Sequence, residues 1–181
     1  MKKAVITAVA LTLALCLAVG GTLAYLTAKT DPVTNTFTAG NVDITLAETQ
    51  RTYKMVPGNN LPKDPKVTVD ADSENCWLFV QVKAEDVTNY LEYSIDTTWT
   101  ELQAGVYYID VDTAAEKGVA FSVLAGDKVT VKTSVTKDML DKVQNGNVTP
   151  KLTFKAFAVQ KDNVATATVA WGIVPAGEKL Q

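Results

Sequence analysis

The chain has 181 residues and contains no histidine. Without an imidazole it can form no Ser-His-Asp or Cys-His nucleophile pair, no HExxH zinc site and no proton shuttle near neutral pH. It also has no basic excess, because 17 basic residues stand against 20 acidic ones. A protein that coats nucleic acid would carry a basic face. We therefore expect a protein that is not an enzyme, uses no cofactor and binds no nucleic acid.

Charge is also absent from a long stretch near the N-terminus, since no charged residue occurs between Lys3 and Lys29. A basic start, an apolar run and then small residues are typical of a secretory signal peptide. Gly20-Gly21 would break a helix near its outer end, and Thr22 and Ala24 are small residues in the positions that a signal peptidase requires. A retained membrane anchor is the alternative, because the run slightly exceeds the ~20 residues that cross a bilayer.

The glycine pair, the small residues and a third detail favour cleavage over a retained anchor. No basic cluster follows the apolar run, as a stop-transfer signal would require. Leu15 precedes Cys16 where a lipoprotein needs a small residue, so we expect no lipid anchor. We therefore expect a signal peptide at residues 1–25, a cleavage region at Ala24, Tyr25 and Leu26, and membrane contact only through the uncleaved precursor.

Cysteine is scarce in the remaining 156 residues, where Cys76 stands alone and no internal disulfide can form. Lys2 and Lys3 leave with the leader, so the mature chain has 15 basic and 20 acidic residues and a net charge of −5. A chain of this length can bury ~70% of its extended surface without a staple. Cys76 opens the apolar run Cys76-Trp77-Leu78-Phe79-Val80, which favours a buried, unreactive thiol over a reactive one.

Residues branched at Cβ are abundant, since Val, Ile and Thr make up 46 of the 156 mature residues. They suit a pleated, half-buried surface. Alternation of apolar and polar residues predicts strands over 42–47, 77–84, 128–133 and 152–158. Leu78, Val80 and Val82 are expected to face inward on a central strand, and Leu152, Phe154 and Ala156 on another. Shorter strands are predicted near 52–56, 66–71, 90–96, 98–103, 106–111 and 119–124.

Turn signals separate these runs, at Pro57-Gly58, Ala104-Gly105, Gly126-Asp127 and Asn145-Gly146. Such spacing indicates an all-β protein, either an antiparallel sandwich or a barrel. A short helix is predicted after Thr136, ending at Gly146, and a second over 164–171. The proline-rich segment 57–65 is predicted to be a rigid connection across one end of the sandwich.

Three segments resemble a known family. They are Gly20-Gly21-Thr22-Leu23-Ala24-Tyr25, then Asn35-Thr36-Phe37-Thr38-Ala39-Gly40-Asn41, and the run from Met55 to Val80 that contains VPGNNLPKDP and ENCWLFV. Together they look like the N-terminal half of TasA/camelysin-like exported proteins of Gram-positive bacteria. The likeness is clear over about residues 20–84 and weaker beyond, apart from Ala170-Trp171.

The resemblance implies a secreted β-sandwich of jelly-roll type, located in the extracellular matrix or cell wall. It also implies removal of the leader by a signal peptidase of the SipW type, with cleavage placed after Tyr25. Some members of the family assemble into fibres of the biofilm matrix by donating an N-terminal strand. We therefore expect residues 1–25 as signal peptide, 26–36 as an extended N-terminal segment and 37–181 as the β-sandwich domain.

The segment 26–36 is polar and rich in Thr, so its composition gives little reason to pack on its own domain. Pro32 cannot donate a ladder hydrogen bond, which fits an edge strand or a kink. An extended segment can fill the open sheet edge of a neighbour. The donor strand expected here comprises Leu26, Thr27, Pro32, Val33 and Thr34, and a disordered tether is the alternative.

Carboxylates alternate in two places and could offer oxygens to Ca²⁺: Asp70, Asp72 and Glu74 in one, Asp110 and Asp112 in the other. Neither has the spacing of an EF-hand loop, so solvated carboxylates at strand ends are the favoured interpretation and no metal site is expected.

Three functions stay open: a fibre-forming matrix protein, a monomeric adhesin-like binding module of the cell envelope, and a camelysin-type peptidase, which the absence of histidine disfavours.

The signal peptide generates the first testable prediction. The mature protein should begin within residues 25–27 and lack the apolar run. Sequencing the N-terminus of protein recovered from culture supernatant or cell wall measures this directly. Recovery of the chain only in the membrane fraction, with Met1 or Lys2 still present, would contradict the prediction.

Overall fold

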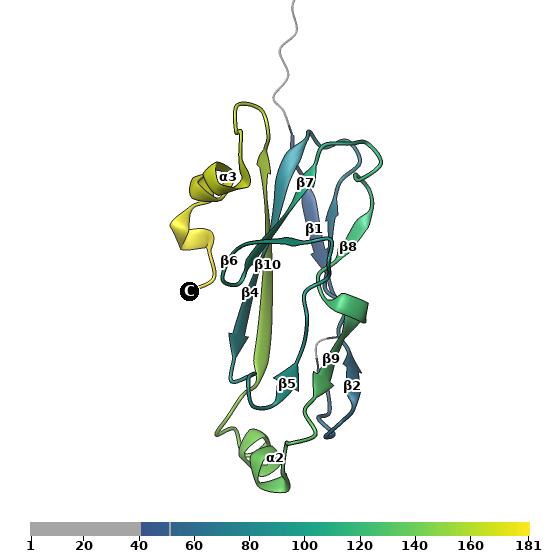
Figure 1. Ribbon diagram of the computed structural model, residues 1–181, viewed down its shortest axis with the longest axis vertical. Helices are drawn as coiled ribbons and strands as arrows, with labels where there is room; N and C mark the ends of the chain where they lie inside the picture. Colours follow the sequence, from purple (N-terminus) through teal and green to yellow (C-terminus); the bar gives the residue numbers. More distant parts are fainter. Residues whose placement is uncertain (1–40, 51) are drawn as a thin grey trace, which may run out of the picture. The chain divides into compact units, whose positions relative to one another are not determined.

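The computed structural model describes residues 41–50 and 52–181 (Figure 1). The predicted signal peptide, the expected donor strand and the boundary at residue 37 lie outside the described residues. The described part contains ten strands, two α-helices and two short 3₁₀ helices. The strands are β1 (Ile44–Ala47), β2 (Asn60–Pro62), β3 (Lys66–Val69), β4 (Cys76–Glu85), β5 (Leu91–Glu92), β6 (Thr100–Gln103), β7 (Val106–Val111), β8 (Ala120–Ser122), β9 (Lys128–Val131) and β10 (Lys151–Gln160); the helices are α2 (Lys137–Gln144), α3 (Ala167–Ile173), η1 (Ala125–Asp127) and η2 (Ala176–Glu178).

The strands form three antiparallel sheets. Their orders are β1-β3-β8, β10-β4-β7-β6 and β2-β9-β5. The first two sheets face each other, since buried residues of β3 and β4 share one hydrophobic cluster. The expected all-β antiparallel sandwich with short helices is confirmed.

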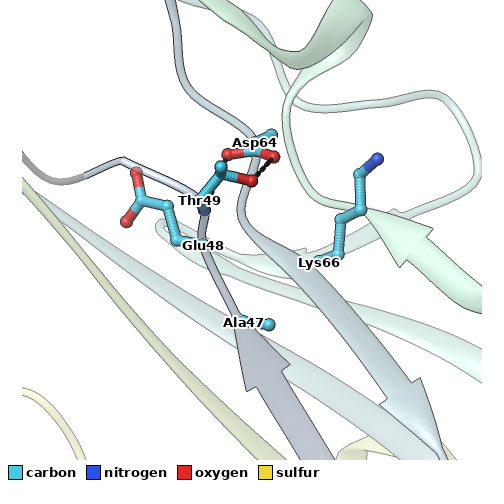
Figure 2. A pocket seen from close by; sticks show the side chains of 5 residues that line it. All are labelled: Ala47, Glu48, Thr49, Asp64 and Lys66. Carbon is cyan, nitrogen blue, oxygen red and sulfur yellow. Dashed lines mark hydrogen bonds between the residues drawn. The ribbon is translucent and has the colours of Figure 1, made fainter.

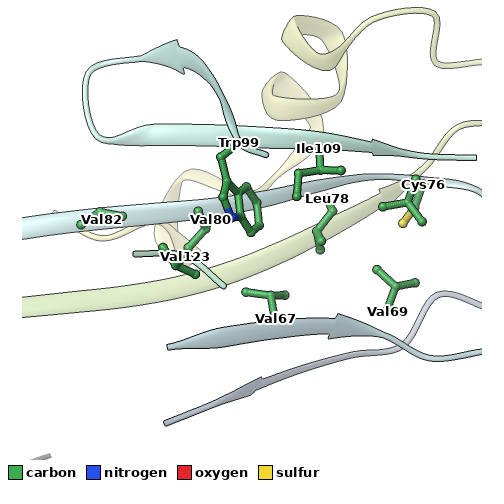
Figure 3. Packing of buried hydrophobic residues seen from close by; sticks show 10 residues of the cluster. Val67, Val69, Cys76, Leu78, Val80, Val82, Trp99, Ile109 and Val123 are labelled. Atoms are coloured by element: carbon green, nitrogen blue, oxygen red, sulfur yellow. The ribbon is translucent and has the colours of Figure 1, made fainter. Parts of the chain in front are cut away.

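Strand β4 lies at the centre of the four-stranded sheet, between β10 and β7. Its register places Val80 opposite Ala156 of β10 and Tyr107 of β7. Leu78, Val80 and Val82 point between the sheets, as predicted, and meet Val67 and Val69 of β3 there (Figure 3). Three residues of β10, Leu152, Phe154 and Ala156, line the same core from its side.

The outer face of β4 is buried as well, because α3 and the segment before it cover it. The ring centroids of Phe79 and Trp171 lie 5.3 Å apart, and those of Phe157 and Trp171 lie 5.5 Å apart. The predicted helix over 164–171 exists but begins at Ala167, since the Thr166 side chain accepts a hydrogen bond from the Val169 N–H and caps it. The Val164 carbonyl instead accepts the indole N–H of Trp77 at 3.0 Å.

Helix α2 forms where the sequence predicted it. The Thr136 hydroxyl accepts the N–H of Met139 at 3.4 Å and so caps the helix. Gly146, just beyond the last turn, has a φ of +73°, in the left-handed region that glycine tolerates best. A second glycine is required for a different reason: a Cβ on Gly105 would lie 2.8 Å from the carbonyl oxygen of Val82.

Two local predictions are wrong. Residues 52–56 form no strand, and the segment 57–65 is no simple connection, because β2 lies within it. Leu61 pairs with Val129 of β9, and Pro62 is tolerated because it ends a strand at a sheet edge. Pairing with a distant strand decided the outcome against the local proline signal. Within the described residues, no helix is long and apolar enough to cross a membrane.

The central position of β4 predicts a large effect of charge at Val80. Val80→Asp would place an unpaired carboxylate in the core, at a cost of several kcal/mol out of a typical domain stability of ~5–15 kcal/mol. The matched control is Ala84→Asp on the same strand, where the side chain is exposed. Thermal melting should show Val80→Asp unfolded or strongly destabilised and Ala84→Asp close to wild type. A shift of only a few degrees for Val80→Asp would contradict the inward assignment.

Candidate functional site

In the described residues no strand pairing joins the two facing sheets at the boundary between β1 and β10, which we call the seam. Part of β10 lies close to β1 there, with Cα atoms of the two strands within 8 Å of each other. Within residues 41–50 and 52–181, β1 pairs only with β3 and β10 only with β4. Each strand therefore turns one edge of backbone N–H and C=O groups toward the seam.

The seam opens into a hollow of about 500 Å³ where β1 ends and β10 begins. Its apolar wall is formed by Leu46 and Ala47 from β1 and by Leu152 and Phe154 from β10. A hollow with both apolar and polar lining beside unpaired strand edges can accept an extended peptide, because the edges supply hydrogen bonds and the hollow accommodates side chains.

An ion pair closes the inner side of this hollow. The Lys63 ammonium lies 2.6 Å from the Glu48 carboxylate, and the two side chains are only 13% and 15% exposed. The same ammonium lies 5.4 Å from the ring centroid of Tyr53 and 5.2 Å from that of Phe154. The paired charges and the two rings stabilise this ammonium in a mostly desolvated place.

Glu48 reaches this position because it continues the inward row of β1. Ile44 and Leu46 face the core, and Glu48 occupies the next inward position. An inward charge at the end of an edge strand discourages unspecific edge-to-edge pairing. Glu48 and Lys63 are not among the residues singled out from the sequence. The signal that could have revealed Glu48 is a carboxylate in phase with the apolar alternation.

A second contact fixes the end of β1 beside the seam (Figure 2). The Asp64 carboxylate accepts the Thr49 hydroxyl on one oxygen and the Thr49 N–H, at 3.0 Å, on the other. These hydrogen bonds hold the pKa of Asp64 below its usual value. They join the chain just after β1 to the chain just before β3. The end of the seam at which the hollow lies, which we call the seam mouth, therefore has a defined geometry.

Other residues singled out from the sequence lie away from the seam mouth. Cys76 is completely buried in the core, and burial raises the pKa of its thiol to about 11, so it stays protonated. Asp110 and Asp112 lie 2.6 Å and 3.6 Å from the ammonium of Lys161. These two carboxylates are thus engaged with a lysine.

Asp70 and Glu74 take part in a turn through their backbone. The Asp70 carbonyl accepts the N–H of Ser73 at 3.1 Å, and the N–H of Glu74 donates to the Asn41 carbonyl at 2.9 Å. Nowhere in the described part of the chain do three His, Cys, Asp or Glu side chains gather as a metal site would require.

The fold defines a class of protein: an antiparallel β-sandwich whose facing sheets are not joined by strand pairing at the seam. The model of the camelysin metallo-endopeptidase family matches residues 1–105. This match covers more than half of the chain, so the chain belongs to that family, as the resemblance indicated. The searches of curated proteins and of solved structures gave no significant match.

The family name bears on the expectation that the protein is not an enzyme. The matching family is named after a metallo-endopeptidase, and this name does not support the expectation that the protein lacks enzyme activity. The residues present fit a catalytic metal poorly, because the whole chain lacks histidine and the described residues bring no three ligands together. We therefore derive no metal-dependent step from this site.

Tyr53 makes the seam mouth sensitive to alkali. Its hydroxyl donates toward Gln50 and lies 3.2 Å from Glu48, and burial first and the Glu48 charge second raise the pKa of Tyr53 to about 12. This pKa is higher in the folded state than in the unfolded chain. The protonated Tyr53 hydroxyl therefore contributes fully to folding stability below about pH 10, and this contribution is lost as the pH rises toward about 12.

We expect Tyr53→Phe, which keeps the ring and removes the proton, to flatten this loss. Melting temperatures of wild type and variant, measured from neutral pH to pH 12, should differ most in slope above about pH 10. Parallel curves over the whole range would show that Tyr53 titrates with its ordinary pKa.

Proposed function

We propose that this protein is a secreted structural protein of the cell surface or biofilm matrix. In this proposal a signal peptidase of the SipW type removes residues 1–25. Residues 26–36 of one copy then add as a strand to the seam of the next copy, and repetition of this contact builds a fibre. Membership of the camelysin family supports the proposal, because the resemblance to TasA-like proteins implies fibre assembly in some members.

The open edge of β10 carries the proposal. This strand has ten residues, all but the first of which are partly buried, yet one of its edges has no partner strand among the described residues. An antiparallel strand directs about half of its N–H and C=O groups to each side. So many open hydrogen-bonding groups beside a hollow with an apolar wall form a template for a further strand.

The length of the N-terminal segment matches this edge. Eleven extended residues span about 36 Å, and the ten residues of β10 span about 33 Å. The segment is rich in Thr and has Val33 among its polar residues, a composition compatible with a strand that is half-exposed at an edge.

The contact would also propagate. The described chain begins beside the end of β10: the Asn41 carbonyl accepts the N–H of Glu74, and the Asn75 carbonyl accepts the N–H of Lys161, both at 2.9 Å. The hollow of the seam lies at the other end of β10. Donor and acceptor are thus different surfaces, and a head-to-tail contact of this kind extends into a filament unless it closes into a ring.

Removal of the segment tests the proposal. Mature protein that starts at Leu26 should form fibres that sediment and are visible by electron microscopy, whereas protein that starts at Phe37 should stay monomeric. Fibres from both proteins, or from neither over a range of salt and pH, would refute the hypothesis of strand donation. The second result would favour the monomeric binding module.

A substitution at the seam tests the acceptor side. Ala47 is exposed on β1 and lines the hollow, so Ala47→Arg should obstruct it and lower fibre yield at least tenfold without lowering the melting temperature by more than a few degrees. Thr45→Arg, on the same strand and face but outside the hollow, is the control. Equal assembly of both variants would show that the donated strand lies elsewhere.

The family name favours a second candidate, a metallo-endopeptidase. Its test is cleavage of a fluorescent protein substrate by the mature protein, with added Zn²⁺ and with a chelator. Cleavage that the chelator abolishes would support this activity, and no cleavage under either condition would refute the peptidase hypothesis.

A further inference from the structure

Helix α2 lies at one end of the described domain (Figure 1), and an apolar groove lies beside it. Its volume is about 730 Å³, and its walls come from the chain before Val56, from β2 and β5, and from α2 and the loop after it. The apolar lining consists mainly of Met55, Leu61, Leu91, Leu140, Val143 and Val148. These side chains surround the buried residues Tyr90, Val131 and Val135 and are themselves only partly buried.

The groove continues into the seam. A smaller hollow of about 140 Å³ lies between them. It shares Tyr53, Leu61, Leu91 and Pro150 with the groove. It shares Lys63, Lys151 and Leu152 with the hollow of the seam. One track therefore runs from α2 past the Lys63 ammonium to the free edge of β10.

A donated N-terminal segment would enter this track at the groove. Asn41 lies near the end of β10, whereas the groove lies before its beginning, about 30 Å away along the strand. In a head-to-tail contact the Asn41 end of one copy meets the α2 end of the next. Residues close to Asn41 then lie in the groove, and residues nearer the mature N-terminus follow the seam, antiparallel to β10.

Phe37 has the position and the chemistry for the groove. It precedes Asn41 by four residues, which span at most about 14 Å. That reach is too short for the groove of its own domain, so the groove that receives this ring would belong to another copy. It is also the one aromatic residue between Leu26 and Gly40, and a ring held in an apolar pocket is a typical anchor of an interface.

We propose that Phe37 of one copy inserts its ring into the groove between α2 and β5 of the next copy and so fixes the register of the donated strand. This inference rests on the proposed fibre assembly and adds a second, apolar contact to it. The pairing with β10 is made by the backbone and could slip along the strand, whereas a single ring in a single groove permits one register.

A peptide of residues 26–40 provides the first test, because it needs no fold of its own. Its binding to the mature protein is followed by fluorescence anisotropy, and its effect on fibre yield by sedimentation. The Phe37→Ala peptide should bind at least about 30-fold more weakly, in line with the loss of a central anchor. The Phe37→Leu peptide should lie between the two. Equal binding of all three peptides would overturn the inference and assign the groove to another ligand.

Cysteine pairing between two copies locates the ring. Phe37→Cys in one mature protein and Val143→Cys in another should form a mixed disulfide on gentle oxidation, since Val143 lines the groove. The control is Lys142→Cys, an exposed neighbour on α2 outside the lining, which should cross-link far less. Buried Cys76 does not compete for the reaction. Equal or preferred cross-linking to residue 142 would overturn the groove assignment.

The outcomes separate this inference from the proposed function. Fibres of unchanged yield from Phe37→Ala protein, together with their loss when residues 26–36 are removed, would overturn the role of Phe37 and leave strand donation intact. Binding that depends on Phe37 and pairs with residue 143, in protein that forms no fibres, would support the groove contact and refute the fibre.

Discussion

Pairing of β4 with β10 and β7 is the interaction on which the rest of the structure depends. The residues of β4 from Cys76 to Val80 are buried on both faces of the strand, toward β3 on one side and toward α3 on the other. Burying a Leu or Phe side chain stabilises a fold by about 1.5–3 kcal/mol, so this run contributes much of the margin of a small domain. Because β10 pairs with β4 over ten residues, its other edge is held rigidly toward the seam.

An open edge on a well-ordered strand promotes aggregation, because it can pair with other chains, unless the edge is protected or occupied by a partner. Here the inward Glu48, neutralised by Lys63 between two aromatic rings, places charge beside the apolar wall of the hollow. Such an arrangement disfavours unspecific sheet stacking and still leaves the backbone of β10 accessible. In the proposed assembly the seam is the edge that a specific partner occupies, and the continuous track toward α2 suits an extended segment.

The sequence allowed prediction of elements whose signals are local. The alternation around Val80 and Phe154 predicted strands and their inward faces, and Thr136 and Gly146 marked the two ends of α2. Prediction was wrong where a distant partner decided the conformation. Leu61 is in a strand because Val129 pairs with it, and residues 52–56 lack such a partner in the described structure. The second helix begins at Ala167, directly after its capping residue Thr166, and not at residue 164.

By itself the sequence determined the fold class, the central strand and the absence of imidazole chemistry, since composition and short-range periodicity suffice for these. Only the tertiary structure decided which strand edges stay open, that Lys63 meets Glu48 across fifteen residues, and that three hollows join into one track. Such features arise where segments remote in the chain come together. Periodicity reports only which way each side chain points along its own strand, so it carries no signal for them.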